Sequence, residues 1–370
     1  MKHFTKIFKF NFYNPTSQLT IAYCLLPILF FITTSCSNSS NLSTDPENEH
    51  ILKNLNPFEQ NKLIGRGINL GNALEAPKEG DWGVTLESYF FEEISKAGFN
   101  SVRLPIKWSS HAQVDSPYTI EKNFFERVDW AIEEAVDNKL AIVINIHHYE
   151  EIFEFPVSEK RRFLSLWKQI AERYKAFPKE VFFEVLNEPQ GNLTSNVWNV
   201  YLADAIGVIR ESNPGRTLIV GTANWGGISS LNQLHLPEAD TNIIVTIHYY
   251  NPFEFTHQGA EWVDGSNAWL GTKWNNSEAE RQAIANDFNL ALNWQSANNR
   301  PIYVGEFGTY SRADIDSRML WTTYVSRLSE LYEFSWSYWE FCSGFGVYDK
   351  NQRVWINKLK EALVPSNIPL

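Results

Sequence analysis

Residues 141–148 read AIVINIHH, an almost unbroken apolar run that ends in two histidines. A strand with one wet face alternates apolar and polar residues, whereas a strand covered on both faces is apolar throughout. The run therefore predicts a strand of a parallel sheet whose two faces are both buried. Its polar end, His147 and His148, would leave the sheet where the strand stops.

The same pattern recurs along the chain. Further β-rich runs cover Gly67–Gly71, Ser101–Ile106, Val181–Asn187, Leu218–Gly221, Ile243–Tyr250, Pro301–Phe307 and Ser335–Phe341. Segments with helical apolar spacing separate them, at Glu87–Ala97, Glu121–Asn138, Glu159–Ala176, Asn196–Glu211, Glu278–Ala297, Asp314–Tyr332 and Trp355–Leu363. This alternation predicts an α/β fold, a (β/α)8 TIM barrel in a single domain. A doubly wound open sheet is the alternative, but the sequence lacks a glycine-rich phosphate-binding turn to support it.

The composition restricts the class of partner. The chain has 370 residues, with 43 Asp and Glu against 32 Lys and Arg and a formal charge of −11. Nucleic acids and anionic membranes bind cationic patches, so we expect neither as a partner, and the balance suits a neutral substrate. Aromatic residues make up 15% of the chain, and a minority of them could form flat platforms for a ligand.

Polar or charged side chains stand at the ends of most predicted strands. In a (β/α)8 barrel these carboxyl ends form the active site. One glutamate there is most simply a salt bridge at the rim, but two at the ends of separate apolar runs indicate a shared chemical site. The residues concerned are Arg103, His147, His148, Asn187, Glu188, His248, Tyr250, Glu306 and Trp339.

Glu188 and Glu306 are the two carboxylates that glycosidic hydrolysis requires. One must be protonated to donate to the leaving oxygen, and the other must be ionised to attack the anomeric carbon. Their predicted strands lie nearly opposite each other, so the two groups would meet over the barrel axis. A separation of about 5 Å would indicate retention of configuration, and a larger gap inversion. Arg103 and Tyr250 could hold one carboxylate ionised.

The segments around these glutamates resemble glycoside hydrolase family 5. Asn187-Glu188-Pro189 and Gly305-Glu306-Phe307-Gly308 carry the likeness, which extends from about Arg66 to Ala362. Residues 66–77, 145–149, 246–253, 255–262 and 338–346 look like the branch of compact endoglucanases that often also cut β-mannans. The resemblance implies a retaining, endo-acting barrel with Glu188 as acid/base and Glu306 as nucleophile.

The resemblance also implies the roles of the surrounding residues. The supporting catalytic residues are Arg103, His148, Asn187, His248 and Tyr250. The substrate-binding residues are Asn72, Glu75, His147, His257, Trp262 and Trp339, although the same residue types could instead cap loops. Trp225 fits a sugar platform and core packing equally well.

The sequence predicts no metal and no cofactor. Adjacent residues of a strand point to opposite faces, so His147 and His148 should not chelate one ion. Cys342 follows a tryptophan-rich strand, and packing explains it better than a role as nucleophile. Ser229-Ser230 after Gly226-Gly227 does not form the turn of a serine esterase.

These observations favour a retaining endo-β-1,4-glucanase, or cellulase, acting on a β-1,4-linked polysaccharide, and we expect a monomer. The nearest alternative is an endo-β-1,4-mannanase or an enzyme with both activities. A surface glycan-binding protein without catalysis and an exo-acting glucosidase are more distant alternatives. The first would keep its affinity and have no turnover to lose, and the second would release only monosaccharide.

The amino-terminal residues predict export. Residues 1–36 combine early lysines with the apolar run Ile21–Ile32 and small residues before Cys36, as in a lipoprotein signal peptide. Cys36 would then be the lipid anchor of a cell-surface or periplasmic protein, and the only link to a membrane. Plain secretion is the alternative. Residues 37–60 are expected to form a flexible tether, and residues 61–370 the catalytic domain.

Overall fold

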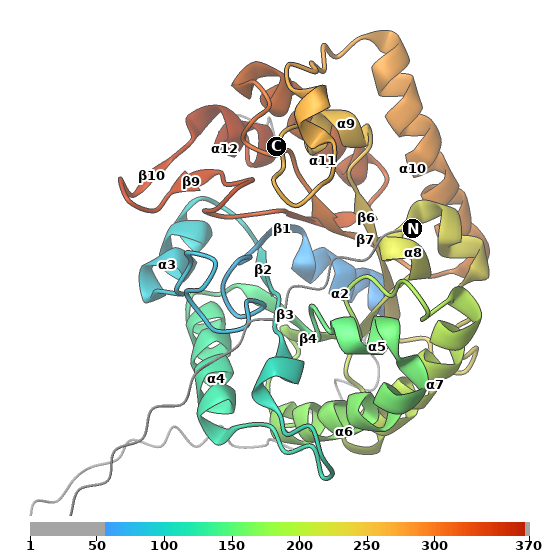
Figure 1. Ribbon diagram of the computed structural model, residues 1–370. Coiled ribbons are helices and arrows are strands. Elements are labelled where there is room, and N and C mark those ends of the chain that lie inside the picture. Colours follow the sequence, from blue (N-terminus) through green and yellow to red (C-terminus); the bar gives the residue numbers. More distant parts are fainter. Residues whose placement is uncertain (1–55, 367–370) are drawn as a thin grey trace, which may run out of the picture. The chain divides into compact units, whose positions relative to one another are not determined.

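The computed structural model describes residues 56–366. Its centre is a closed barrel of parallel strands in the order β1 to β8, in which β8 pairs with β1 (Figure 1). This confirms the predicted (β/α)8 barrel, and each predicted run overlaps one strand. The strands are β1 (Arg66–Asn69), β2 (Ser101–Leu104), β3 (Ala141–Asn145), β4 (Val181–Glu184), β5 (Leu218–Gly221), β6 (Ile243–Tyr249), β7 (Ile302–Phe307) and β8 (Ser335–Tyr338).

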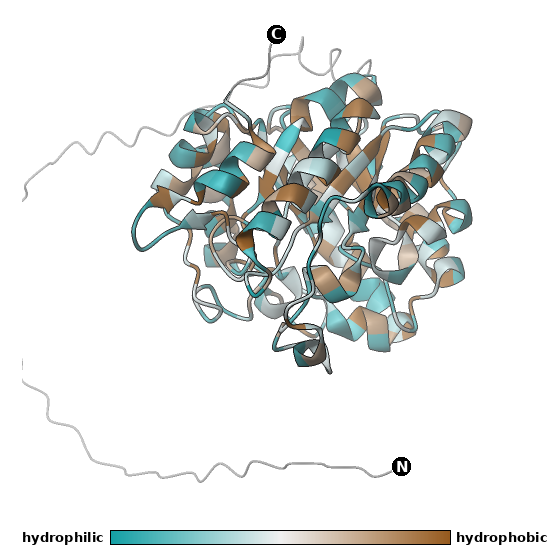
Figure 2. Cartoon of the chain, turned by 90° about the horizontal axis from the view of Figure 1, so that it is seen from above, coloured by the Kyte–Doolittle hydropathy of each residue, from teal (hydrophilic) through white to brown (hydrophobic). Residues whose placement is uncertain are grey.

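Helices surround the barrel. The longer ones are α3 (Ser88–Lys96), α4 (Lys122–Asp137), α6 (Pro156–Tyr174), α7 (Ser195–Ser212), α10 (Glu278–Asn298), α11 (Ile315–Leu331) and α12 (Asn357–Leu363). In Figure 2 these helices carry both hydrophilic and hydrophobic residues, as expected where one face packs on the sheet and another meets water. None of the helices within residues 56–366 combines the length and apolarity needed to cross a membrane.

Shorter elements interrupt the regular alternation. After β5 the chain forms only α8 (Ala223–Gly226) and the 3₁₀ helix η2 (Ile228–Gln233) before β6. The long connection after β6 contains α9 (Phe253–Thr256) and η3 (Ser266–Trp269) before α10 begins. Both connections border the carboxyl end of the barrel and supply residues to the cleft described below.

The folded domain includes residues that the sequence assigned to the tether. Helix α2 (Pro57–Ile64) is capped by Asn56, whose side chain accepts from the Phe58 N–H at 2.9 Å. Asn61 on this helix donates to the Ile302 carbonyl at 3.0 Å, which ties α2 to the barrel. Residues 57–60 therefore belong to the folded domain and not to the tether. The predicted signal peptide, Cys36 and the tether up to residue 55 lie outside the described residues.

The barrel interior changes from apolar to polar along its axis. One buried apolar layer contains Ile64, Ala141, Val143, Phe182, Ile219, Ile244 and Tyr303. Nearer the carboxyl ends of the strands, the wholly buried side chains are Asn69, Arg103, Asn145 and Glu184. Asn69 lies opposite Arg103 in the strand register, and Asn145 lies opposite Glu184. This polar layer supports the residues at the barrel mouth.

Candidate active site

Arg103 on β2 is the centre of the site's hydrogen-bond network. Its Nε and Nη2 donate to both carboxylate oxygens of Glu184, at 2.6 and 2.7 Å. Its Nη1 donates to Glu306 Oε1 at 2.7 Å and to Asn69 Oδ1 at 2.9 Å. Nη2 also donates to Asn187 Oδ1 at 2.7 Å. A wholly buried guanidinium is stable only with such partners, and its planar fork fixes their directions.

Glu184 is a member of this network that the sequence analysis missed. It lies on β4, is wholly buried, and was hidden inside the apolar run Val181–Asn187. Burial acts to raise the pKa of Glu184, but the charge and hydrogen bonds of Arg103 outweigh it and leave the pKa below its ordinary value. The signal available in the sequence was an acidic residue inside an otherwise apolar strand. An unpaired glutamate is costly there, so it indicates a buried partner.

Glu306 on β7 receives two donors. Arg103 donates to its Oε1, and the Tyr250 hydroxyl donates to its Oε2 at 3.0 Å. Burial, followed by the negative charge of Glu306, raises the pKa of Tyr250 well above its ordinary value, so this hydroxyl keeps its proton. A guanidinium and a hydroxyl converging on one carboxylate hold it in a fixed position at the end of β7.

Glu188 lies beyond β4 and has a different environment. Its backbone is left-handed, with φ 44°, which turns the side chain away from the strand direction. Its Oε1 lies 2.8 Å from His248 Nδ1, and its side chain is 23% exposed against 7% for Glu306. Burial lowers the pKa of His248, but Glu306 and Glu188 outweigh burial and leave it raised. Glu188 therefore faces the cleft with one partner that can exchange a proton.

The two carboxylates are close together. One oxygen of Glu188, one oxygen of Glu306 and a ring nitrogen of His248 all lie within 4.8 Å of one another. This spacing matches the retaining arrangement, in which the two carboxyl groups lie close together. A cation could fit three such groups, but both oxygens of Glu306 already accept hydrogen bonds from the protein.

His147 and His148 do not have the orientation that the sequence analysis expected. β3 ends at Asn145, so both histidines lie in the following loop rather than on a strand. His148 has φ 47°, and the two rings lie edge to face with centroids 4.6 Å apart instead of on opposite faces. Burial lowers the pKa of both rings, most strongly that of His147. His147 also stacks on Trp339, with centroids 5.9 Å apart and 13° between the planes.

The loop after β1 supports the site from behind. Glu75 is wholly buried, and its carboxylate accepts from the backbone N–H groups of Asn72 and Ala73. Glu75 therefore caps the loop, and its buried carboxylate is out of reach of a ligand in this conformation. Asn72 is half-buried with φ 64° at the start of the same turn.

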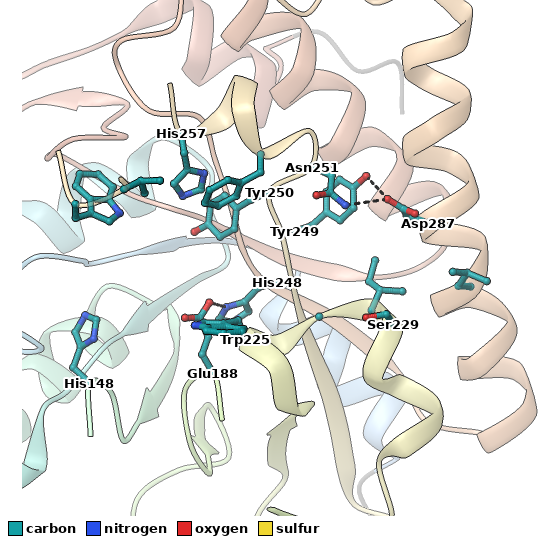
Figure 3. Close-up of a pocket in the computed structure, with 16 residues that line it drawn as sticks. His148, Glu188, Trp225, Ser229, His248, Tyr249, Tyr250, Asn251, His257 and Asp287 are labelled. Carbon is teal, nitrogen blue, oxygen red and sulfur yellow. Dashed lines mark hydrogen bonds and ion pairs between the residues drawn. The ribbon is translucent and has the colours of Figure 1, made fainter. Parts of the chain in front are cut away.

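An elongated cleft of about 690 Å³ extends from His148 and Glu188 toward α10 (Figure 3). Trp225 is 56% exposed and lines the cleft. Of its two predicted roles, a flat surface at the cleft therefore fits, and packing in the core does not. Trp262, which is 61% exposed, and His257 line the cleft from the connection after β6. Burial lowers the pKa of His257 to about 4, so this ring is neutral.

Gly308, two residues after Glu306, is required by close packing against Trp339. A β-carbon at Gly308 would lie 2.1 Å from the carbonyl oxygen of Trp339, so no larger residue fits without displacing the loop. The sequence Gly305-Glu306-Phe307-Gly308 thereby lets Trp339 approach the end of β7. Trp339, half-buried and stacked on His147, then presents a flat surface at the end of β7, where its N–H donates to the Phe307 carbonyl.

A TIM barrel with two carboxylates paired in this way at its mouth defines a glycoside hydrolase. Residues 61–344 match the family described as cellulase, glycosyl hydrolase family 5. The chain belongs to that family.

Known proteins of this kind are similar over most of the described residues. Endoglucanase H of Acetivibrio thermocellus is 33% identical over 317 residues, which are 84% of this chain but only 34% of that longer protein. Endoglucanase B of Clostridium cellulovorans is 26% identical, over 88% of this chain and 78% of its own length. The crystal structure of endoglucanase Cel5A from Thermotoga maritima is 56% identical with a TM-score of 0.83, and covers 84% of this chain and 100% of that chain.

Proposed function

We propose that this chain is a retaining endo-β-1,4-glucanase. The observation that carries the proposal is the pair Glu188 and Glu306, whose oxygens lie within 4.8 Å and of which Glu306 is paired with Arg103 and Glu188 with His248. Endoglucanases among its relatives, and the 56% identical Thermotoga maritima enzyme, support the substrate class.

The proposed reaction has two displacements. Glu306 attacks the anomeric carbon while Glu188 gives its proton to the departing glycosidic oxygen, which leaves a covalent glycosyl ester on Glu306. Glu188, now ionised, then takes a proton from a water that displaces Glu306 from the sugar. Arg103 and Tyr250 hold the nucleophile in place. With its oxygen bound to Arg103, Asn187 has its amide nitrogen left to donate to a sugar hydroxyl.

Internal cleavage follows from the shape of the cleft. Its lining extends from His148 past Glu188 to Asp287 and Leu290 on α10, so polysaccharide can continue past the reacting sugar (Figure 3). We therefore expect mixed oligosaccharides from barley β-glucan and carboxymethylcellulose. Release of glucose alone would instead indicate an exo-acting glucosidase.

β-Mannan is the second candidate substrate. The 56% identical Thermotoga maritima Cel5A has been crystallised with mannotriose and with cellobiose. Mannose differs from glucose in its axial 2-hydroxyl, and we expect Asn187 to contact that hydroxyl. Reducing-sugar release from galactomannan and carboxymethylcellulose, measured side by side, distinguishes a glucanase, a mannanase and an enzyme with both activities.

The catalytic assignment is tested by trapping. A 2-deoxy-2-fluoro cellobioside with a good leaving group should form a stable ester on Glu306, detected by mass spectrometry of peptides. Labelling of another residue contradicts the assignment. Glu188→Gln and Glu306→Gln should lower turnover by several orders of magnitude without unfolding the protein. If the wild type binds cello-oligosaccharides but shows no turnover, the chain is a glycan-binding protein instead.

We further propose that the enzyme acts outside the cytoplasm and carries lipid on Cys36. The lysine-rich start, the apolar run Ile21–Ile32 and the small residues before Cys36 support this. Palmitate labelling of the expressed full chain should be lost in Cys36→Ala. Unchanged labelling contradicts the anchor, and export without any labelling supports plain secretion.

A further inference from the structure

The end of the cleft at α10 contains an acidic residue that has no role in the chemistry described so far. Asp287 lies on α10 and lines the cleft together with Leu290, about one helical turn further along. Asp287 is half-buried, and Leu290 is 57% exposed. Ile228 and Ser229, at the start of η2, line the same end of the cleft. This end therefore combines a carboxylate, a hydroxyl and two apolar side chains.

Two side chains that follow one another at the end of β6 hold Asp287 in place (Figure 3). The Tyr249 hydroxyl donates to Asp287 Oδ2 at 2.9 Å, and the Asn251 amide donates to the same oxygen at 3.4 Å. Burial, followed by the negative charge of Asp287, raises the pKa of Tyr249, so this hydroxyl keeps its proton. Both of these donors reach Oδ2, which leaves Oδ1 as the oxygen that can meet a ligand.

The charge of Asp287 is not balanced by a nearby cation. Within residues 56–366, no ion pair joins Asp287 to a lysine, arginine or histidine. Its two hydrogen-bond donors, a phenol and an amide, are both neutral. The screening length at ordinary ionic strength is about 8–10 Å, so a carboxylate at the wall of an open cleft acts on charges that enter the cleft beside it. It attracts a positive group there and repels a negative one.

The position of Glu188 identifies which part of the substrate reaches Asp287. The acid gives its proton to the departing oxygen, so the leaving sugars lie on the side of Glu188. Pro189, the next residue, accepts from the Trp225 N–H at 3.4 Å, which places Trp225 on that side. The cleft continues past Trp225 to Asp287, and His148 lies at its other end (Figure 3). The reducing end of the substrate therefore passes Asp287.

We propose that Asp287 determines the charge selectivity of the leaving side of the cleft: a neutral or positively charged sugar binds there, and a sugar that carries a carboxylate is disfavoured. The inference rests on the proposed function, because it names the chemical class of the departing part of the same β-1,4-linked chain. It assigns Asp287 to specificity and gives it no part in the proton transfers.

The test uses cello-oligosaccharides of three to six glucose units with three kinds of reducing end. Reduction gives a neutral alditol, oxidation gives a negatively charged aldonate, and reductive amination gives a positively charged aminoalditol. All three ends are open chains and differ mainly in charge, and all belong to the leaving side. At the length that brings this end to Asp287, wild-type kcat/KM should fall from aminoalditol to alditol to aldonate, by roughly threefold at each step.

Three variants separate the charge of Asp287 from its other contacts. Asp287→Asn keeps the shape of the side chain and removes the charge, so the three ends should be cleaved with equal kcat/KM. Tyr249→Phe removes a donor to Asp287 and keeps the charge, so the order of the ends should persist. Asp137→Asn is the matched control, because it removes an equal charge from the exposed end of α4, just before β3 and at the amino-terminal end of the barrel. It should leave kcat/KM unchanged on all three ends.

A purely structural role gives a different result. If Asp287 only anchored α10 to β6, Asp287→Asn would lower kcat/KM by the same factor for all three ends, and this outcome overturns the proposal. Equal kcat/KM for the three ends in the wild type, at every length, overturns it as well. An order of ends that survives in Asp287→Asn assigns the selectivity to another residue and also rejects the proposal.

Wild-type turnover of barley β-glucan, measured in parallel, separates the two proposals. Turnover without any order among the three ends rejects the role of Asp287 and leaves the endoglucanase standing. Absence of turnover on every glucan rejects the endoglucanase, and the selectivity given to Asp287 falls with it. Calorimetric titration of Glu306→Gln gives a readout besides activity: the aminoalditol should bind roughly tenfold more tightly than the aldonate, and Glu306→Gln/Asp287→Asn should bind both equally.

Discussion

The carboxyl end of the barrel contains two pairs of glutamates in different surroundings. Glu188 and Glu306 have side-chain partners; Glu188 lines the cleft, and an oxygen of Glu306 lies within 4.8 Å of one of Glu188. Glu75 and Glu340 are wholly buried and accept hydrogen bonds from backbone N–H groups, which for Glu340 include those of Cys342 at 2.8 Å and Phe345 at 3.1 Å. Residue type is the same in both pairs, so the difference in chemistry comes from the neighbours.

The comparison shows what burial does to a carboxylate with and without a cation. Burial raises the pKa of Glu75 to about 8 and that of Glu340 to about 7, because their backbone donors only partly offset the loss of water. Glu184 is equally buried, yet its pKa is lowered because Arg103 outweighs burial. A guanidinium thus decides whether a buried glutamate here carries a charge.

The largest expected effect separates the two pairs directly. Glu306→Gln removes the proposed nucleophile and should lower kcat on carboxymethylcellulose by several orders of magnitude. Glu340→Gln, equally isosteric, should lower it far less, because this side chain is buried behind the cleft. Equal losses in the two variants, with both proteins folded by circular dichroism, would mean that the pairs do not differ in function.

Replacing Arg103 should affect both stability and activity. Arg103→Met leaves Glu184 and Glu306 without their cation, and losing one partner of a buried ion pair costs about 3–5 kcal/mol of unfolding free energy. Urea denaturation measures this cost. Arg103→Met/Glu184→Met is the matched control: it should recover much of the stability but not the activity, since Glu306 still lacks its cation. Recovery of activity would contradict the role given to Arg103.

Tyr250→Phe should have a smaller effect, confined to catalysis. The variant loses the hydroxyl that donates to Glu306, and a hydrogen bond to a charged group contributes about 1.5–3 kcal/mol. We expect kcat to fall roughly tenfold to a hundredfold with little change in Tm. Tyr332→Phe, which removes a hydroxyl bound to Asn289 at 2.8 Å away from the cleft, should leave kcat unchanged. A similar loss in both variants would refute the assignment.

The smallest effect concerns stability and pH. The pKa of Glu340 is raised from 4.5 to about 7 on folding, so its contribution to stability is present below pH 4.5 and is lost as the pH rises through about 7. The slope from one such group is at most about 1.4 kcal/mol per pH unit. Urea unfolding from pH 5 to 8 should therefore show a flatter decline in Glu340→Gln than in the wild type. Parallel curves would show that Glu340 does not titrate in this window.

The opposite sign applies to Glu184. Its pKa is lowered on folding, so its contribution is present above the ordinary carboxyl pKa and is lost as the pH falls. Lowering the pH should therefore reduce the stability that the Arg103 network contributes. Raising the pH through about 7 to 8 should reduce the stability that Glu340 and Glu75 contribute. The contribution of Glu75 to stability changes in the same direction as that of Glu340, and it is lost as the pH rises through about 8.

Sequence reasoning succeeded where the signal was local. Apolar runs with polar ends predicted the barrel, because a strand buried on both faces must be apolar wherever it meets the sheet and the helices. It failed where the signal depended on distant partners or backbone geometry. Glu184 went unnoticed because its partner Arg103 lies 81 residues away, and His147 and His148 were misplaced because β3 ends before them. Pro57 was assigned to the tether although Asn56-Pro57 is a helix start signal.

The sequence by itself determined the alternation of strands and helices, the acidic character and the motifs that contain Glu188 and Glu306. Only the tertiary structure decided that their carboxylate oxygens lie within 4.8 Å and that Glu75 is buried. The physical reason is that separation and charge state depend on neighbours from remote segments. Arg103 and Glu306, 203 residues apart in the chain, become partners at 2.7 Å only when the barrel closes.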